Sequence, residues 1–255
     1  MGRAGEKRIG TPWRLVACGL TSVVTCGCNF HVFSPPARLA VMESAEAAPF
    51  KQTTIGVGGG AALATAGLSG FGGYGSLAVR RGLHPNVEGS ITATAGVFFG
   101  GSQTCSQFGA PSSCRPTNGD VGGAALRVGV KWAPWERNVA IVGGLGGGGS
   151  ALGGFVAPDL GVIVSYDDGV VVPYASALVG MSQPIGASVY QWGNRASAPT
   201  TTLTVTVTGG LKIVVRPARS AVGGAILLGV GGFGLWDAWT HFGMLVASLG
   251  GEVTF

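Results

Sequence analysis

Charge and histidine are both scarce in this chain of 255 residues. Asp, Glu, Lys and Arg make up only 11% of it, against about 25% in soluble globular domains. The three histidines, His31, His84 and His241, lie far apart in the sequence. Proton transfer and nucleophilic catalysis rely on histidine or on a perturbed carboxylate. The composition therefore argues against an enzyme, and the lack of a Cys-x-x-Cys spacing argues against a metal site.

A basic surface for nucleic acid is also missing, although the formal net charge is +5. Four of the 16 basic residues and one of the 11 acidic residues fall within the first 27 positions. The remainder thus carries 12 basic and 10 acidic groups, a net charge of about +2. These groups are scattered, without the basic stripe or the interleaved aromatic residues of a nucleic-acid interface. We predict no nucleic-acid partner.

Glycine is abundant, with 48 residues, and it produces two spacings that imitate a dinucleotide-binding motif. One is Gly56-x-Gly58-x-x-Ala61, and the other is Gly144-x-Gly146-x-x-Gly149. In a chain so rich in glycine, such spacings recur by chance. Neither begins a convincing helix, and no Lys-Ser/Thr pair completes a phosphate-binding loop. The sequence predicts no cofactor.

What the chain does contain is apolar alternation, which is clearest in the segment that runs to its last residue. Leu249, Val253 and Phe255 share one phase, and Ser248 and Glu252 share the other. A period of two predicts a β-strand with one apolar face. A terminal phenylalanine after alternate apolar residues resembles the last strand of Gram-negative outer-membrane β-barrels. The resemblance implies that Leu249, Val253 and Phe255 form a signal for the barrel insertion machinery, and that outer-membrane lipid surrounds the protein.

Strand-like segments extend upstream through the whole region 51–255. The clearest is 202–215, where Leu203, Val205 and Val207 oppose Thr204 and Thr206. In some of the others glycine blurs the two faces. We predict an all-β fold, a closed antiparallel transmembrane β-barrel of about ten strands, with eight as the alternative. The segments are 53–65, 72–80, 87–99, 124–132, 139–149, 160–166, 170–181, 202–215, 221–234 and 242–255.

A bundle of transmembrane helices is the rival fold, because mean hydropathy is +0.43 and 138–158 carries no charge. That run is full of glycine, and each glycine costs about 1 kcal/mol in a helix. The connections also favour the barrel, since short and long ones alternate as they do between the two sides of an outer membrane. Short turns are predicted at 81–86, 133–138, 167–169 and 216–220, and longer outer loops at 66–71, 100–119, 150–158, 182–200 and 235–241. Aromatic girdles are predicted near the turns at Trp132, Trp135 and Tyr166, and near the loops at Trp192, Trp236 and Trp239.

The N-terminus resembles a secretory signal peptide over 1–27, with basic residues up to Arg14 and an apolar stretch after them. Gly27-Cys28 resembles a lipoprotein cleavage site, although Cys26 stands where a small residue is usual. The sequence leaves lipidation of Cys28 and ordinary cleavage both open. Residues 28–50 are predicted to be a periplasmic linker, in which 37–48 could hold a short helix bracketed by prolines.

Only two cysteines, Cys105 and Cys114, lie in the body of the chain. An exported protein meets an oxidising compartment, so we predict a disulfide between them. It would stabilise the fold by roughly 2–3 kcal/mol, as expected for a short closed loop.

Six charged residues fall on the polar phase of the strands or at their periplasmic ends. On the lipid face a charge would cost ~2–4 kcal/mol at mid-membrane, so these side chains should point into the lumen. Their mixed signs predict a salt-bridge cluster that closes the lower lumen, or else a charged constriction that tunes a pore. The remaining inward residues are mostly small and polar, which predicts water-filled space above the cluster. The six are Arg80, Glu88, Arg127, Lys131, Lys212 and Glu252.

The leading hypothesis is a non-enzymatic outer-membrane protein, with long loops outside and termini periplasmic. It would act in envelope structure or adhesion through loops 100–119 and 182–200, with an extracellular ligand that the sequence does not identify. The alternative is a narrow passive pore for small solutes. A less favoured hypothesis is a hydrolase at the outer rim, for which Asp237 and His241 are the candidate residues.

Overall fold

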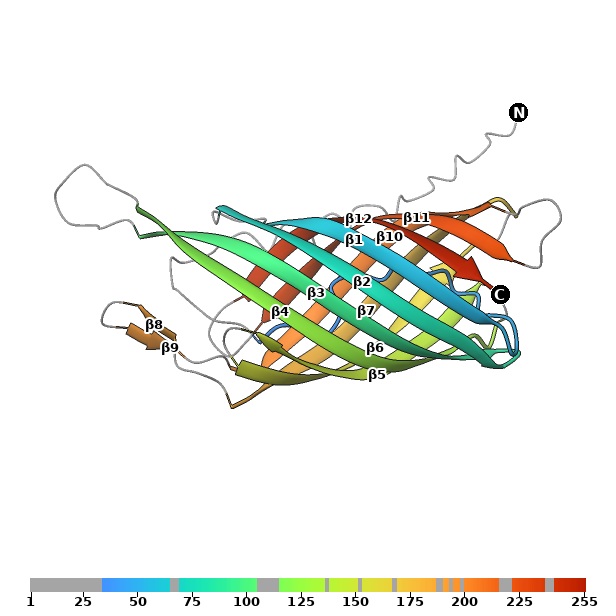
Figure 1. Ribbon diagram of the computed structural model, residues 1–255, viewed down its shortest axis with the longest axis horizontal. Helices are drawn as coiled ribbons and strands as arrows, with labels where there is room; N and C mark the ends of the chain where they lie inside the picture. Colours follow the sequence, from blue (N-terminus) through green and yellow to red (C-terminus); the bar gives the residue numbers. More distant parts are fainter. Residues whose placement is uncertain are drawn as a thin grey trace, which may run out of the picture.

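The computed structural model describes residues 34–64, 69–104, 115–135, 138–150, 153–166, 169–186, 190–192, 195–197, 200–215, 222–236 and 241–255. Ten strands close into one antiparallel barrel, which confirms the predicted fold class and the choice of ten strands over eight (Figure 1). The barrel strands are β1 (Thr53–Ala64), β2 (Ser69–His84), β3 (Val87–Thr104), β4 (Arg115–Trp132), β5 (Val139–Ser150), β6 (Gly153–Ser165), β7 (Val171–Ile185), β10 (Thr202–Val215), β11 (Gly223–Trp236) and β12 (His241–Thr254).

Each barrel strand pairs with its neighbours in the chain, and β1 pairs with β12 to close the ring. Two short strands, β8 (Tyr190–Trp192) and β9 (Arg195–Ser197), form a separate hairpin between β7 and β10. We call the end of the barrel with the β2–β3 turn and Phe255 the turn end. The opposite end, with the β7–β10 connection, is the loop end (Figure 1).

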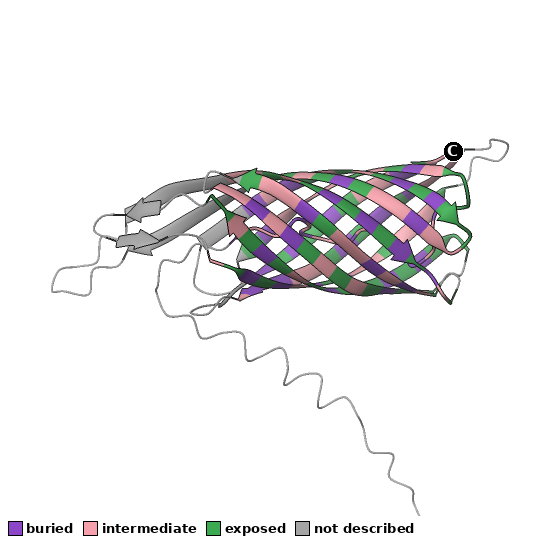
Figure 2. Ribbon diagram, turned by 90° about the horizontal axis from the view of Figure 1, so that it is seen from below, coloured by how far each residue is buried: buried purple, intermediate pink, exposed green. Residues whose placement is uncertain are grey.

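Along the strands, residues that are exposed on the outer surface alternate with residues that are buried inside the barrel (Figure 2). On β10 the inward residues are threonines, and Thr202 to Thr208 on the even positions are all buried. Leu203 and Val207 on the odd positions are 47% and 54% exposed. This is the phase that the sequence predicts, because a polar residue on the outside would face hydrocarbon.

The outer surface is a continuous apolar belt. Monomeric soluble proteins rarely expose apolar patches of more than a few hundred Å². The belt over a closed ring is the pattern of an outer-membrane β-barrel. Trp132, Trp135 and Tyr166 lie exposed near the turn end, and the Trp236 ring covers Gly234 near the loop end. Members of the belt include Val57, Leu77, Leu126, Val128, Leu145, Leu160, Val179, Val207, Val230, Leu245, Leu249 and Val253.

Among the described residues, the structure has no helix of the length and apolarity needed to cross a membrane.

Residues 34–50, which we call the lumen segment, run through the inside of the barrel as an irregular extended chain (Figure 1). The prediction of a periplasmic linker with a short helix over 37–48 is therefore wrong for the described part. A helix of about 12 residues is marginal on its own. Here the apolar side chains instead pack against the wall, Leu39 against Tyr74 and Phe233, and Val41 within the cluster of Ile163.

The lumen segment enters at one end of the barrel and leaves at the other. Ser34 contacts Ser182 and Thr202 beside the β7–β10 connection, at the loop end. Phe50 forms a bridge to Gly82 at the turn end, and the chain then reverses into β1. Ser34 and Phe255 therefore lie at opposite ends, whereas a periplasmic linker would have placed them at the same end.

Candidate functional site: the occupied lumen

The loop end of the lumen segment is held by uncharged hydrogen bonds. The Ser34 backbone N–H donates to Thr202 Oγ1 at 3.0 Å. The Ser34 and Ser182 hydroxyls lie 2.7 Å apart, and Ser182 Oγ also donates to the Pro35 carbonyl at 2.6 Å. Ser34, Ser182 and Thr202 are all buried. β7 and β10 thus present two hydroxyls that fix the segment where it enters the barrel.

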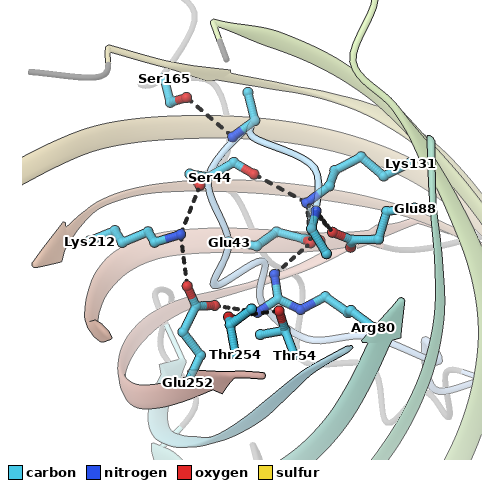
Figure 3. Close-up of polar contacts among 12 residues, drawn as sticks. Glu43, Ser44, Thr54, Arg80, Glu88, Lys131, Ser165, Lys212, Glu252 and Thr254 are labelled. Atoms are coloured by element: carbon cyan, nitrogen blue, oxygen red, sulfur yellow. Dashed lines mark hydrogen bonds and ion pairs between the residues drawn. The ribbon is translucent and has the colours of Figure 1, made fainter. Parts of the chain in front are cut away.

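Glu43 is the centre of the charged contacts in the lower lumen (Figure 3). Its carboxylate lies 2.7 Å from an Arg38 guanidinium nitrogen, which belongs to the same segment. The Lys131 ammonium from β4 lies 3.2 Å away, and an Arg80 nitrogen from β2 lies 3.6 Å away. One carboxylate from the segment therefore bridges two strands of the wall. A buried carboxylate without such partners would be costly.

A second carboxylate, Glu252 on β12, completes the network on the opposite side. It pairs with Arg80 and lies 2.7 Å from the Lys212 ammonium of β10. Arg80 therefore lies between Glu252 and Glu43 (Figure 3). Lys212 also reaches Ser44 Oγ at 3.5 Å. Charges from the wall and from the segment form one connected set.

The turn end of the segment is fixed by acceptors from the wall. The Ala48 N–H donates to Glu88 Oε2 at 2.6 Å, and the same carboxylate lies 3.3 Å from Lys131. The Ala45 N–H donates to Ser165 Oγ at 3.2 Å. Glu88 is only 1% exposed, so both of its contacts are shielded from water and correspondingly strong.

Five of the six charges predicted to cluster meet in this network: Arg80, Glu88, Lys131, Lys212 and Glu252. Arg127 does not join them, because its guanidinium binds both oxygens of Asp159 on β6. Sequence reasoning missed Asp159 and Glu43. The signal was a charge imbalance, since the predicted set has four cations and only two anions. Buried cations need counter-charges.

Wall glycines make room for the lumen segment. A Cβ on Gly146 of β5 would collide with Ala37, and one on Gly58 of β1 would collide with the Met42 side chain. At the turn end, a Cβ on Gly82 would run into the backbone oxygens of Ala48 and Pro49. At these three positions glycine lets the lumen segment pass close to the wall.

A small cavity lies beside the segment. A cavity of about 60 Å³ is bordered by Arg38, Glu43 and Arg80, together with Tyr74 and Thr92 of the wall. That volume accommodates a few water molecules. The lumen segment and large inward side chains such as Tyr174 occupy part of the lumen in which the sequence predicts water-filled space.

Several predicted site residues lie elsewhere. Cys28, Cys105, Cys114 and Asp237 fall outside the described residues, so the disulfide and the lipidation stay predictions. His241 begins β12, where its backbone pairs with Trp236. Of the predicted insertion signal, Leu249, Val253 and Phe255 are all exposed on the outer face. Within the described ranges, no group of three or more His, Cys, Asp or Glu side chains could hold a metal ion.

No protein-family model matches this chain, and no curated protein matches it. Among solved structures, the translocator domain of autotransporter NalP from Neisseria meningitidis is similar with a TM-score of 0.45 and 11% sequence identity. The match covers 79% of this chain and 88% of that one. At this identity the likeness concerns the barrel alone.

The fit of the lumen segment can be tested with trypsin, which cleaves after Arg and Lys. Arg38 lies inside the barrel, so we expect its peptide bond to resist trypsin while exposed Lys51 is cut. Gly146→Val should place side-chain atoms where Ala37 packs and make Arg38 cleavable at least tenfold faster. Gly149→Val on the same strand is the matched control, because nothing lies within 4 Å of a Cβ there. Equal protection of Arg38 in both variants would contradict the packing described.

Proposed function

We propose that the protein is a non-enzymatic outer-membrane barrel that acts in envelope structure or adhesion through the segments at its loop end, 100–119 and 182–200. The observation that carries this proposal is that the chain's own residues 34–50 occupy the lumen. An occupied lumen makes a permanently open passive pore the poorer hypothesis. We therefore assign the function to the segments outside the membrane, because loops on a rigid scaffold often carry binding residues.

The strands at the loop end support this proposal, because they are longer than the membrane requires. β3 and β4 have 18 residues each, and a transmembrane strand needs about 9–11. Their pairing continues to Thr104 and Arg115, so half of the expected loop 100–119 is a paired ribbon. The strand bounds predicted there, 87–99 and 124–132, are too short. The added residues are polar or glycine and show no apolar alternation, so the sequence pattern does not reveal these parts of the strands. There β3 and β4 pair with each other.

The membrane side of the proposal uses the apolar belt and the last strand. Outer-membrane lipid contacts the belt, and the barrel insertion machinery binds the last strand through Leu249, Val253 and Phe255. We place the loop end outside the cell and the turn end in the periplasm, because longer connections face outward in such barrels. The rim hydrolase would need Asp237 and His241 to act together, and Asp237 lies outside the described residues.

Adhesion is tested on cells that display the full-length protein and two variants, in which either 102–117 or 186–200 is replaced by a short Gly-Asn turn. We expect cell–cell aggregation and retention on glass to fall at least fivefold in one or both variants. A heat-shift gel confirms that each barrel is folded, and Gly149→Val serves as the unaffected control. Unchanged adhesion with both segments replaced would overturn the proposal. So would a hydrolytic activity that disappears in Asp237→Asn and His241→Gln.

A further inference from the structure

We propose that the lumen segment is a displaceable plug, and that the barrel conducts small anions when the plug leaves. This inference adds an activity to the proposed function and does not depend on it. It rests on how the segment is attached, on what its departure would leave behind, and on the charges that would then line the lumen.

The barrel does not need the segment in order to stay closed. β1 pairs with β12 from Thr54 with Thr254 to Ala64 with Met244, so the ring is complete without residues 34–50. The segment contributes no strand to the ring. The contacts of Ser34, Ala45 and Ala48 described above use side-chain acceptors of the wall. Those contacts can be lost one by one while the strand ladder stays intact.

A hinge lies where the segment joins the barrel. Lys51 has a φ of 68°, which makes it the non-glycine residue in the left-handed region among the described residues. Its N–H donates to the Gly82 carbonyl at 2.9 Å, and Gln52 N–H donates to the Pro49 carbonyl at 2.9 Å. The reversal is thus fixed by local bonds at the turn end. Loss of the wall contacts of residues 34–48 would leave the segment joined to the barrel only through this turn.

The space left by the segment would be wide enough for hydrated ions. An extended chain with its side chains occupies a cross-section of roughly 5 by 10 Å, the spacing between strands and between stacked sheets. The wall behind it is polar along β10, where Thr204, Thr206 and Thr208 point inward, whereas Leu227, Phe233 and Leu235 of β11 give an apolar stretch beside it. Hydroxyl groups of this kind can be hydrated. The resting state persists because leaving would also expose apolar wall residues that now contact Leu39 and Val41.

The charges left on the wall favour anions. Glu43 belongs to the segment and leaves with it, together with Arg38. The ring that remains has three cations, Arg80, Lys131 and Lys212, but only the two carboxylates Glu88 and Glu252. Arg127 and Asp159 neutralise each other higher in the lumen. Rings of Arg and Lys select anions in membrane pores.

The test uses full-length protein purified in detergent and reconstituted into planar bilayers, with a heat-shift gel to confirm folding. We expect rare, brief openings in the original protein, and an open probability at least tenfold higher in Glu43→Gln. In a tenfold KCl gradient, the reversal potential of the openings should lie closer to the equilibrium potential of chloride than to that of potassium. The double variant Ser34→Cys with Ser182→Cys locks the segment, since the two hydroxyl oxygens are 2.7 Å apart.

Each outcome decides the proposal. Openings that vanish in the oxidised double variant and return with dithiothreitol, while both single cysteine variants under the same oxidation keep theirs, would support a plug. Persistent conductance in the locked protein, or silence in a folded Glu43→Gln protein, would overturn it. Cation selectivity would overturn the anion assignment. If Glu43→Gln fails the gel, Ser34→Ala with Thr202→Val weakens the loop-end anchor instead, since only the bond from Ser182 to the Pro35 carbonyl then remains of the three described. Adhesion measured on the same variants reports separately on the proposed function.

Discussion

Glu252→Ala is expected to lower the free energy of unfolding of the barrel by about 3–5 kcal/mol, the usual cost of leaving a buried charge without its partner. The Glu252 side chain is 5% exposed and faces two cations, Arg80 and Lys212. Among the described residues, alanine would leave the Lys212 ammonium with the Ser44 hydroxyl, at 3.5 Å. Of its two ion-pair partners in the described part of the chain, Arg80 would keep Glu43, at 3.6 Å.

Urea unfolding in lipid vesicles, followed by tryptophan fluorescence, measures this loss. Lys212→Met is the matched comparison, because Glu252 then keeps Arg80 and no cation is stranded. We expect the Lys212 variant to lose less than Glu252→Ala. The double variant should recover part of the loss, since residues in one network are not additive. A change below about 1 kcal/mol in Glu252→Ala, the size of an exposed ion pair, would show that water reaches this network freely.

Alternation alone was sufficient to predict the strands whose two faces differ. The predicted range 202–215 coincides with β10, where leucine and valine alternate with threonine. In a closed barrel with lipid outside, an error of one residue would bury every valine and expose every threonine, so the phase is strongly specified. The glycine-rich strands β1 and β5 carry weak phase information. Their membership of the barrel can still be inferred, because every strand in a membrane needs two neighbouring strands to satisfy its backbone hydrogen-bonding groups.

The position of the lumen segment could not be predicted in this way. Its prolines and short apolar stretches show no period of two or of 3.6. Its conformation is set by tertiary contacts, such as Leu39 with the wall and Ser34 with Thr202. The charge imbalance among the predicted inward residues was the one local clue. It required an additional acid inside the lumen, and Glu43 supplies it.

Two carboxylates of the site, Asp159 and Glu43, were not predicted from the sequence, for different reasons. Asp159 precedes Leu160 on the opposite phase of a predicted strand, so its inward direction could have been inferred from the alternation. Its pairing with Arg127 depends on the register across β4, β5 and β6, which the sequence does not reveal. The inward position of Glu43 could not be predicted from the alternation, because Glu43 does not lie in a strand. A plugged lumen and an open lumen therefore have the same strand pattern and differ only in where residues 34–50 lie.

Val230→Arg should destabilise the barrel by about 2–4 kcal/mol, as expected for a cation on the lipid face near mid-membrane. Val230 lies in the middle of β11, opposite Gly209 and Ala247, and is 68% exposed. An arginine there has no partner in the wall and must extend toward an interface at a cost. Urea unfolding in vesicles measures the loss.

The control for Val230→Arg is the same substitution of valine by arginine at a position nearer the membrane surface. Val253→Arg lies on the same outer face near the turn end, opposite Gly224 and Ile55, and should cost about 0–1 kcal/mol because the headgroups are close. Detergent micelles of short chain length should reduce the difference between the two variants, since they let water reach the middle of the belt. Equal and small losses at both positions in lipid would contradict the membrane-spanning assignment. A large loss at Val230 alone fixes both the lipid face and the depth of β11 within the bilayer.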